Sequence, residues 1–148
     1  MRCYVQTHLD VPADAVWMAV KKPATLLHVT RGFLDFSGLD RTIPEWHEGM
    51  SFQTRFWFFH VLPAWWKHTM TVKQIDEAQR MLVSNEHGGI ISKWNHTIRV
   101  SPATSGCEYS DEIEIKAGLF TAIVWLYANV FYRYRQRRWR KFARKLGG

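Results

Sequence analysis

The sequence is poor in residues that cross-link a chain or hold metals. It has two cysteines among 148 residues, Cys3 and Cys107. Two cysteines cannot form the dense disulfide framework of a small secreted domain, and both stand in strand-like alternation, which predicts buried thiols. The zinc-site spacings CxxC and HExxH are missing, and no two of the seven histidines are three or four residues apart. We therefore expect no metal and no cofactor.

Long apolar runs are missing as well. The first twelve residues, MRCYVQTHLDVP, contain no stretch typical of a signal peptide. Residues 117–132 are interrupted by Thr121 and Asn129 and fall short of the ~20 residues that cross a bilayer. No repeat, linker or low-complexity tract divides the chain. We expect a soluble cytoplasmic protein with a single ligand-binding domain over residues 1–148, and leave monomer and dimer open.

Aromatic residues, by contrast, are abundant: eight Trp, nine Phe and five Tyr. So many rings are difficult to pack into one compact core of this size. One interpretation is a core that is lined with rings but incompletely filled, which is a cavity. The other is a bulky core together with some exposed rings. Trp46, Phe52, Trp57, Trp66 and Trp94 fit either interpretation.

The segment from Gly118 to Leu146 is predicted to form one long helix. No proline interrupts it, and apolar side chains recur at steps of three and four, the spacing of a helix that faces a core. At 1.5 Å per residue the helix would be roughly 40 Å long, enough to span a small domain. The predicted core-facing stripe consists of Phe120, Ile123, Val124, Tyr127, Val130, Phe131, Tyr134, Arg138 and Phe142.

The C-terminal half of this segment holds the excess of positive charge. Eight Lys or Arg residues lie between positions 133 and 145, whereas the whole chain, with 20 basic and 13 acidic residues, has a net charge of +7. One interpretation is that these cations complement the helix dipole and keep the helix end soluble. The other is a patch for an anionic membrane surface, with nucleic acid ranked behind lipid. The residues of that patch would be Arg133, Arg137, Arg140, Lys141 and Arg144.

Most of the remaining chain has β-strand patterning. A half-buried strand over residues 3–9 precedes two short helices, which begin near residues 13 and 23. Strand patterns follow over residues 34–37, 50–59, 65–75, 80–86, 93–100 and 107–116. Strands in hairpin succession form an antiparallel sheet, which needs a cover on one face. We therefore expect an α+β fold, in which a curved antiparallel sheet of about six to seven strands wraps around the long C-terminal helix.

Several short motifs point to a known group of folds. They are VPADAVW at residues 11–17, PEWHEG at 44–49, WNH at 94–96, YSDEI at 109–113 and YRYRQRRW at 132–139. In this order they resemble the helix-grip fold of the START / Bet v1-like (SRPBCC) superfamily, including its polyketide cyclase/dehydrase and lipid-transport group. The resemblance covers nearly the whole chain. It implies a hydrophobic cavity but no single reaction, because the superfamily contains carriers, sensors and a few enzymes.

A pair of ionisable residues is predicted on the inner face of the last hairpin. If Val100 pairs with Cys107, His96 lies opposite Asp111. A histidine–carboxylate pair in an apolar cup is a candidate acid/base unit. The alternative is a structural hydrogen bond between two buried polar groups.

The other predicted cavity residues come from strand alternation and from the helix. Arg55 is expected to point inward and to need Glu86 or Asp111 as its counter-ion. The predicted ligand-binding residues are Arg55, Trp57, Trp66, His68, Met70, Glu86, Trp94, His96, Tyr109, Asp111, Tyr127 and Phe131.

Two functions remain open at this stage. The first is binding or carriage of a hydrophobic small molecule, such as a lipid, an isoprenoid or a polyketide. The second is a cyclase- or dehydratase-like enzyme without metal that uses His96, Asp111 and Arg55. No Ser or Cys stands in a nucleophile-elbow context, which favours the binding role.

Overall fold

A computed structural model describes the chain except residues 38, 41, 59–61, 64–65 and 148, and except the side chains of residues 57–58 and 62–63. The elements follow one another along the sequence with short connections. They are β1 (Arg2–Leu9), α1 (Ala13–Val20), α2 (Pro23–Thr30), β2 (Leu34–Ser37), β3 (Ser51–Phe58), β4 (Leu62–Pro63), β5 (His68–Asp76), β6 (Met81–Gly88), β7 (Ile91–Pro102), β8 (Cys107–Lys116), the 3-10 turn η1 (Gly118–Phe120) and α3 (Thr121–Leu146).

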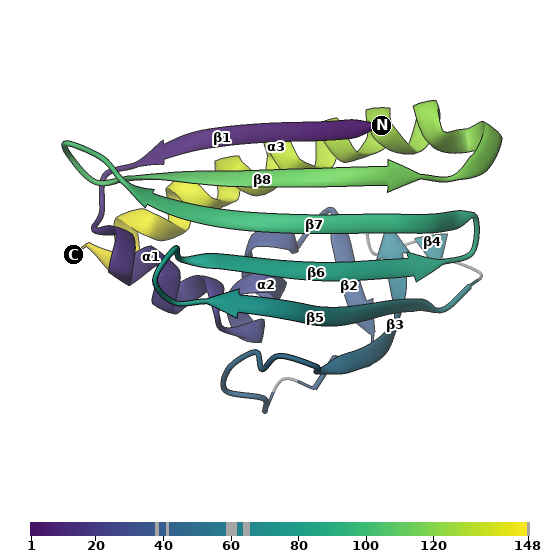
Figure 1. The fold of residues 1–148 in the computed structure, drawn as a ribbon, viewed down its shortest axis with the longest axis horizontal. Coiled ribbons are helices and arrows are strands. Elements are labelled where there is room, and N and C mark those ends of the chain that lie inside the picture. Colours follow the sequence, from purple (N-terminus) through teal and green to yellow (C-terminus); the bar gives the residue numbers. More distant parts are fainter. Residues whose placement is uncertain (38, 41, 59–61, 64–65, 148) are drawn as a thin grey trace.

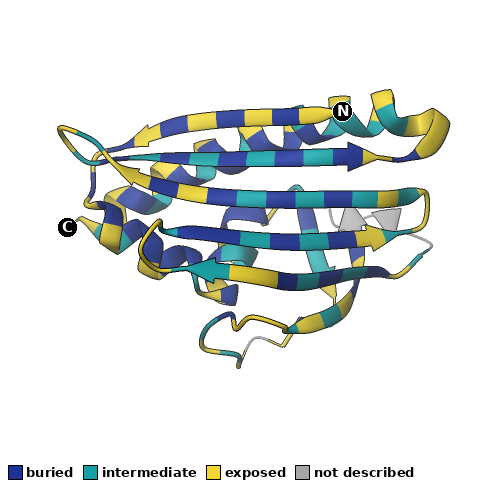
Figure 2. Ribbon diagram, viewed as in Figure 1, coloured by how far each residue is buried: buried dark blue, intermediate teal, exposed yellow. Residues whose placement is uncertain are grey.

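The strands form one antiparallel sheet in the order β1-β8-β7-β6-β5-β3-β2, with the two-residue β4 paired to β3. In Figure 1, α3 runs behind this curved sheet, and α1 and α2 lie at the end where α3 finishes. Residues along β1 and β8 alternate between more and less buried, as Figure 2 shows. The predicted helix-grip architecture, with two short helices after the first strand, is confirmed.

The motifs VPADAVW (residues 11–17) and PEWHEG (residues 44–49) both precede β3 and have clear structural roles. Pro12 caps α1, and the following turn buries Val16 and Trp17 in the core. In the PEWHEG motif, Gly49 has a φ of 80°, a left-handed conformation that favours glycine. The Glu48 carboxylate accepts a hydrogen bond from the Ile75 amide at 2.7 Å. This motif thus fastens the loop before β3 to strand β5.

The last hairpin has a different register from the predicted one. Cys107 pairs with Pro102, so Ile98 rather than His96 lies opposite Asp111. The reversal is completed within residues 103–106, where Gly106 has a φ of 71° and its carbonyl accepts a hydrogen bond from the amide of residue 103. Strand β7 is therefore longer than predicted, whereas β8 has the predicted bounds. A shift of two residues leaves every side chain on its expected face.

The stripe that helix α3 buries is rotated from the predicted one, although both include Phe131. The predicted core residues Phe120, Ile123 and Val130 are 52%, 67% and 52% exposed. The first half of the helix is apolar nearly all round, so apolar spacing alone does not select the face that packs. The buried residues are Ala128, Phe131, Tyr132, Arg135, Gln136, Trp139 and Ala143. No helix formed by the described residues, α3 included, is long and apolar enough to cross a membrane.

The two cysteines are free and buried, as predicted. Burial raises the pKa of the Cys107 thiol to about 11 and also raises that of Cys3. Both thiols are therefore packing groups that stay protonated at neutral pH.

Two isoleucines provide a test of this packing. Ile113 on β8 is fully buried, whereas Ile123 on α3 is 67% exposed. We expect Ile113→Ala to lower the free energy of unfolding by ~2–5 kcal/mol through lost burial and a residual cavity. Ile123→Ala should change it by less than about 0.5 kcal/mol. Urea unfolding followed by circular dichroism measures both, and equal losses would contradict the assigned helix face.

Candidate functional site

A cavity of about 310 Å³ lies between the concave face of the sheet and α3. This volume is at the lower end of the range for small-molecule sites. Most of its wall is apolar or aromatic, with Val29 from α2, Phe56 from β3 and Phe131 from α3 among the contributors. Apart from Tyr and Trp, the polar lining residues are Thr25, His68, Ser84, Glu86, His96 and Arg135.

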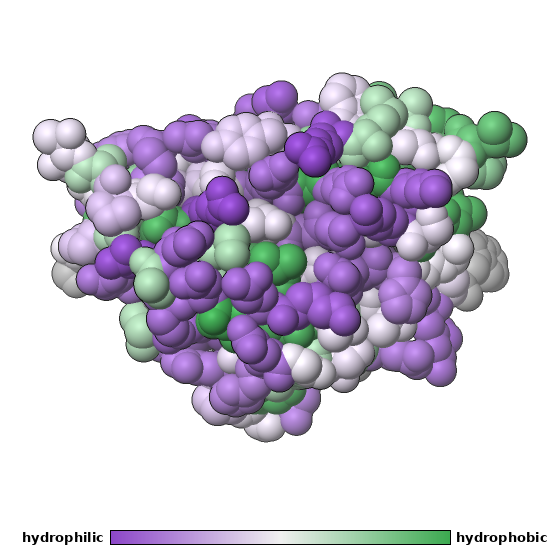
Figure 3. Space-filling view, in the orientation of Figure 1, coloured by the Kyte–Doolittle hydropathy of each residue, from purple (hydrophilic) through white to green (hydrophobic). Residues whose placement is uncertain are grey.

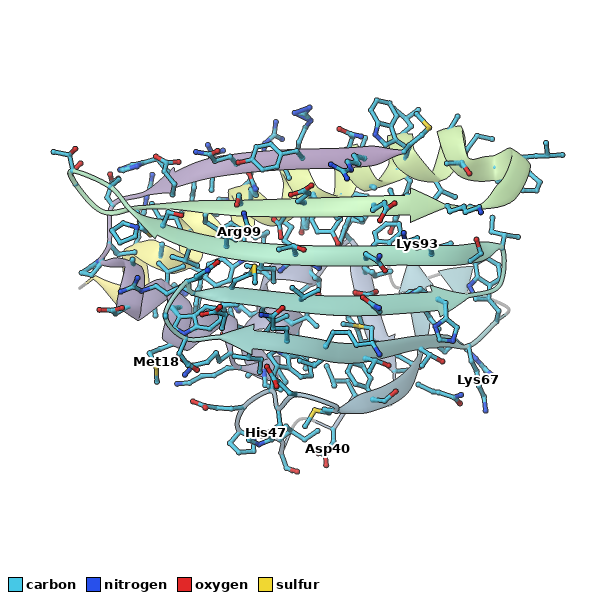
Figure 4. The ribbon with its side chains drawn as sticks, viewed as in Figure 1. Met18, Asp40, His47, Lys67, Lys93 and Arg99 are labelled. Atoms are coloured by element: carbon cyan, nitrogen blue, oxygen red, sulfur yellow. The ribbon has the colours of Figure 1, made fainter. Side chains whose placement is uncertain are left out.

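Strand alternation brings these polar groups to one surface. Three consecutive strands each place alternate residues on the concave face, which is the buried face. The residues between them point to the opposite, convex face, where Lys93 and Arg99 are visible in Figure 4. The inward sets are His68, Met70 and Val72 on β5, Leu82, Ser84 and Glu86 on β6, and Trp94, His96 and Ile98 on β7.

Asp111 is the centre of a buried polar cluster. The hydroxyl of Tyr109 and the Nε2–H of His96 both donate to its Oδ1, at 3.0 and 2.9 Å. The Arg135 guanidinium lies 3.7 Å from the same oxygen and donates to the Tyr109 hydroxyl at 2.9 Å. Gln136 donates to Oδ2 at 3.4 Å. The predicted His96–Asp111 pair therefore forms, diagonally across the hairpin rather than directly opposite.

The cluster sets the ionisation of its members. Burial, the largest influence on Asp111, raises its pKa, but Arg135 and the hydrogen bonds from His96 and Tyr109 outweigh it and hold the pKa below its ordinary value. Burial raises the pKa of Tyr109 and of Tyr132 well above that of a free tyrosine. At neutral pH the cluster thus contains a carboxylate, a guanidinium and two neutral hydroxyls.

These charges fix the role of the His96 ring. Ionised Asp111 only accepts hydrogen bonds, so His96 Nε2 carries the proton that it donates. In the neutral ring, Nδ1 then holds a lone pair. Nδ1 has no hydrogen-bond partner among the described residues, and the ring lines the cavity. His96 can therefore accept a proton or a hydrogen bond from a bound molecule.

A second histidine–carboxylate pair adjoins the first. His68 Nε2 lies 3.1 Å from Glu86 Oε2, and the Ser84 hydroxyl donates to Glu86 Oε1 at 3.1 Å. Ser84 is the direct cross-strand neighbour of His96. The two clusters therefore form one row of polar side chains across β5, β6, β7 and β8. In the part of the chain that the structure describes, no three His, Cys, Asp or Glu side chains converge as metal ligands would.

Arg135 is the site residue that the sequence interpretation missed. It was counted with the basic helix end, yet it is buried, and its guanidinium carbon lies 5.5 Å from the centre of the Tyr132 ring. Its Nε has no hydrogen-bond partner among the described residues. The signal was available: Ala128, Phe131, Arg135 and Trp139 follow one another at helical spacing. An inward arginine at that position supplies the positive charge that the buried Asp111 carboxylate needs.

The other predicted residues divide into three groups. Arg55 was predicted wrongly: it is exposed, because β3 turns its neighbours Thr54 and Phe56 inward. The side chain of Trp57 lies outside the described residues. Tyr109 and Asp111 are buried behind the cavity wall and do not line it. Those that line the cavity are Trp66, His68, Met70, Glu86, Trp94, His96, Tyr127 and Phe131.

Solved structures resemble this chain over nearly its whole length, although no protein-family model and no curated protein sequence matches it. Protein CV1439 from Chromobacterium violaceum is 13% identical, with 96% of both chains covered and a TM-score of 0.75. Norcoclaurine synthase from Thalictrum flavum, in complex with dopamine and hydroxybenzaldehyde, is 15% identical, with 98% of this chain and 87% of that chain covered and a TM-score of 0.66.

A third similar structure is DynU16 from the dynemicin biosynthetic locus. It is 15% identical and has a TM-score of 0.58, with 92% of this chain and 46% of that chain covered. These neighbours have Bet v1-like folds. The chain has a Bet v1-like helix-grip fold. At identities of 13% to 15% the likeness is one of fold.

The buried ion pair in this helix-grip fold yields a stability prediction. Asp111→Asn leaves the Arg135 charge unpaired, so we expect a loss of about 3–5 kcal/mol at neutral pH. Replacing both partners, with Asp111→Asn and Arg135→Met together, should cost less than Asp111→Asn alone. Urea unfolding of Asp111→Asn, of Arg135→Met and of the double variant measures these values. Additive losses would show that the two side chains do not interact.

The same carboxylate predicts a pH dependence. The pKa of Asp111 is lower in the folded than in the unfolded state. The ionised carboxylate therefore makes its full contribution to the free energy of unfolding at pH values above the unfolded-state pKa of about 3.9. The contribution is lost as pH falls below that value through the lower folded pKa. The difference in free energy of unfolding between wild type and Asp111→Asn, measured by urea unfolding, should therefore shrink as the pH is lowered. A difference that persists unchanged in strong acid would contradict this ionisation.

Proposed function

We propose that the protein binds a small, largely apolar molecule in the cavity between the sheet and α3. The observation that carries this proposal is the composition of the wall. Aromatic and aliphatic side chains form most of it, while the polar row that contains His96 and Glu86 occupies one side. Sites of this kind bury an apolar body and use a few placed polar groups to orient it.

The polar row favours a ligand with a hydroxyl or another hydrogen-bond donor. The Nδ1 lone pair of His96 accepts such a donor, and the His96 ring is held in place by Asp111. The modest volume of about 310 Å³ favours a compact molecule, such as a polyketide-like or isoprenoid compound, over a long acyl chain.

The similar structures support the same class of ligand. Norcoclaurine synthase was solved with two small aromatic compounds, dopamine and hydroxybenzaldehyde. DynU16 belongs to a biosynthetic locus. By analogy of fold, these neighbours support ligand binding as the role that we propose for this chain.

Two substitutions of opposite effect test the cavity. Leu82→Trp should fill it and weaken binding of the fluorescent probe N-phenyl-1-naphthylamine at least about tenfold, because the volume is removed. Trp94→Ala should enlarge the cavity and alter probe affinity without preventing folding. Val83→Trp is the matched control, since this neighbour of Leu82 lies on the opposite face of β6.

Probe titration gives the affinities, and circular dichroism confirms folding. Native and denaturing mass spectra of freshly purified protein, compared with an organic extract, would identify a retained ligand. Failure of the wild type to bind any apolar probe, or equal weakening by Leu82→Trp and Val83→Trp, would refute the proposal.

A second candidate function is enzymatic, and the His96–Asp111 pair is the observation that favours it. Nδ1 of His96 can remove a proton from carbon next to a carbonyl, the kind of step that a cyclase or dehydratase uses. Asp111 lies behind the ring, where its carboxylate fixes the ring orientation and stabilises the positive charge that forms when Nδ1 takes up the proton. Exposed Arg55 has no place in this mechanism.

Proton exchange separates this candidate from simple binding. We expect His96→Gln to slow loss of deuterium from an α-deuterated aryl ketone by about 10²-fold or more, because the base is removed. His87→Gln, at an exposed position on β6, is the control. Exchange at equal rates in both variants, measured by NMR, would eliminate His96 as the base.

A further inference from the structure

The solvent-facing side of α3 is divided into two halves along its length. Its exposed residues recur at steps of three and four, so they form one stripe opposite the buried face. The first half of this stripe, with the preceding turn η1, is apolar and comprises Leu119, Phe120, Ile123, Leu126 and Val130. The second half is basic and comprises Arg133, Arg137, Arg140, Lys141 and Arg144.

The apolar half is unusually exposed. Leu119, Ile123 and Leu126 are 100%, 67% and 60% exposed. Figure 3 shows this end of the molecule as a hydrophobic area, at the upper right where η1 and the start of α3 lie in Figure 1. Contiguous apolar surface of this kind marks a site of interaction with a partner or a membrane.

The charges on the stripe identify the partner. Helix α3 contains no Asp or Glu. None of the five exposed cations forms an ion pair with a described residue. The stripe therefore presents apolar surface next to uncompensated positive charge. That combination complements a surface that is apolar inside and anionic outside, which describes a membrane with acidic headgroups.

Other partners match this stripe less well. In a parallel pairing of two copies, the basic halves would face each other without any carboxylate between them. In an antiparallel pairing, each apolar half would lie against the other copy's cations. A nucleic acid backbone would attract the basic half but would leave the apolar half exposed.

We propose that the outer face of α3 docks on an anionic membrane surface. The apolar half enters the boundary between headgroups and acyl chains, and the basic half lies over the acidic headgroups. This differs from attachment by the C-terminal cations alone, because the aliphatic side chains supply insertion and the cations supply selectivity for charged lipid.

The docked face adjoins the opening of the cavity. Ile90 and Ile123 both line the cavity and are 46% and 67% exposed. Docking would therefore bring the cavity rim to the bilayer, so that an apolar ligand could pass between them without crossing water. This exchange depends on the proposed ligand binding, whereas the docking itself does not.

Vesicle flotation of the intact protein tests the docking without any ligand. The vesicles contain phosphatidylcholine alone or phosphatidylcholine with phosphatidylglycerol, at low and high salt. We expect wild type to float with the anionic vesicles and to dissociate as salt rises. The basic variant Arg137→Gln, Arg140→Gln and Arg144→Gln should bind them roughly 100-fold more weakly.

Two further variants separate insertion from charge. The apolar variant Leu119→Ser, Ile123→Ser and Leu126→Ser should lose at least about tenfold in affinity while it keeps its net charge. The control Lys22→Gln, Lys73→Gln and Arg99→Gln removes three exposed cations elsewhere, one of which is Arg99 on the convex face of the sheet (Figure 4), and should bind like wild type apart from a small general effect of charge.

The outcomes are distinct. Absence of wild-type binding to anionic vesicles at low salt would overturn the proposal. Equal losses in the control and basic variants, or undiminished binding of the apolar variant, would overturn it as well. A wild-type dimer that the apolar variant abolishes, without vesicle binding, would identify the stripe as an interface between copies. Since no ligand is present, these results are independent of the probe titrations.

Discussion

The buried carboxylate of Asp111 is the constraint on which the rest of the interior depends. A charge without solvent contact is tolerated only with an opposite charge and hydrogen bonds. Here β7 supplies His96, β8 supplies Tyr109 and α3 supplies Arg135. The rotation of α3 is therefore set by a polar contact as well as by packing. A turn of one residue, about 100°, would withdraw the guanidinium from Asp111.

The contacts of Asp111 also give the cavity one polar side and one apolar side. Asp111 lies behind the wall and holds the His96 ring, Arg135 lines the cavity, and Ser84 and Glu86 continue the polar row toward His68. The remaining wall is apolar. A ligand with one polar end would therefore enter in a single orientation. Binding and acid/base chemistry need the same preorganised row, and they differ in what the bound molecule presents to His96.

Strand alternation made much of this site predictable from sequence. The inward positions of His68, Glu86, Trp94 and His96 depend only on a period of two, which a register shift of two residues leaves unchanged. Arg55 was predicted wrongly because aromatic residues occupy both odd and even positions in the β3 sequence, SFQTRFWF, so a period of two does not distinguish the inside from the outside.

The helix was harder to interpret, for a related physical reason. Its length and position were predictable from the apolar spacing, but its rotation was not, because the first half is apolar nearly all round. The decisive residue was Arg135, which composition groups with the exposed cations. Its helical spacing with Phe131 and Trp139, together with the need of Asp111 for a counter-ion, separates it from Arg133 and Arg137.

The location of Arg135 has a consequence for the order in which the molecule is assembled. The strands that carry the polar row are joined by short hairpins, so their contacts are local and can form early. The positive partner of Asp111 comes from an element that follows all of these strands in the chain. Until α3 packs against the sheet, the carboxylate of Asp111 lacks its positive partner and the concave face lacks its cover. Packing of α3 therefore closes the cavity and pairs the buried charge of Asp111 at the same time.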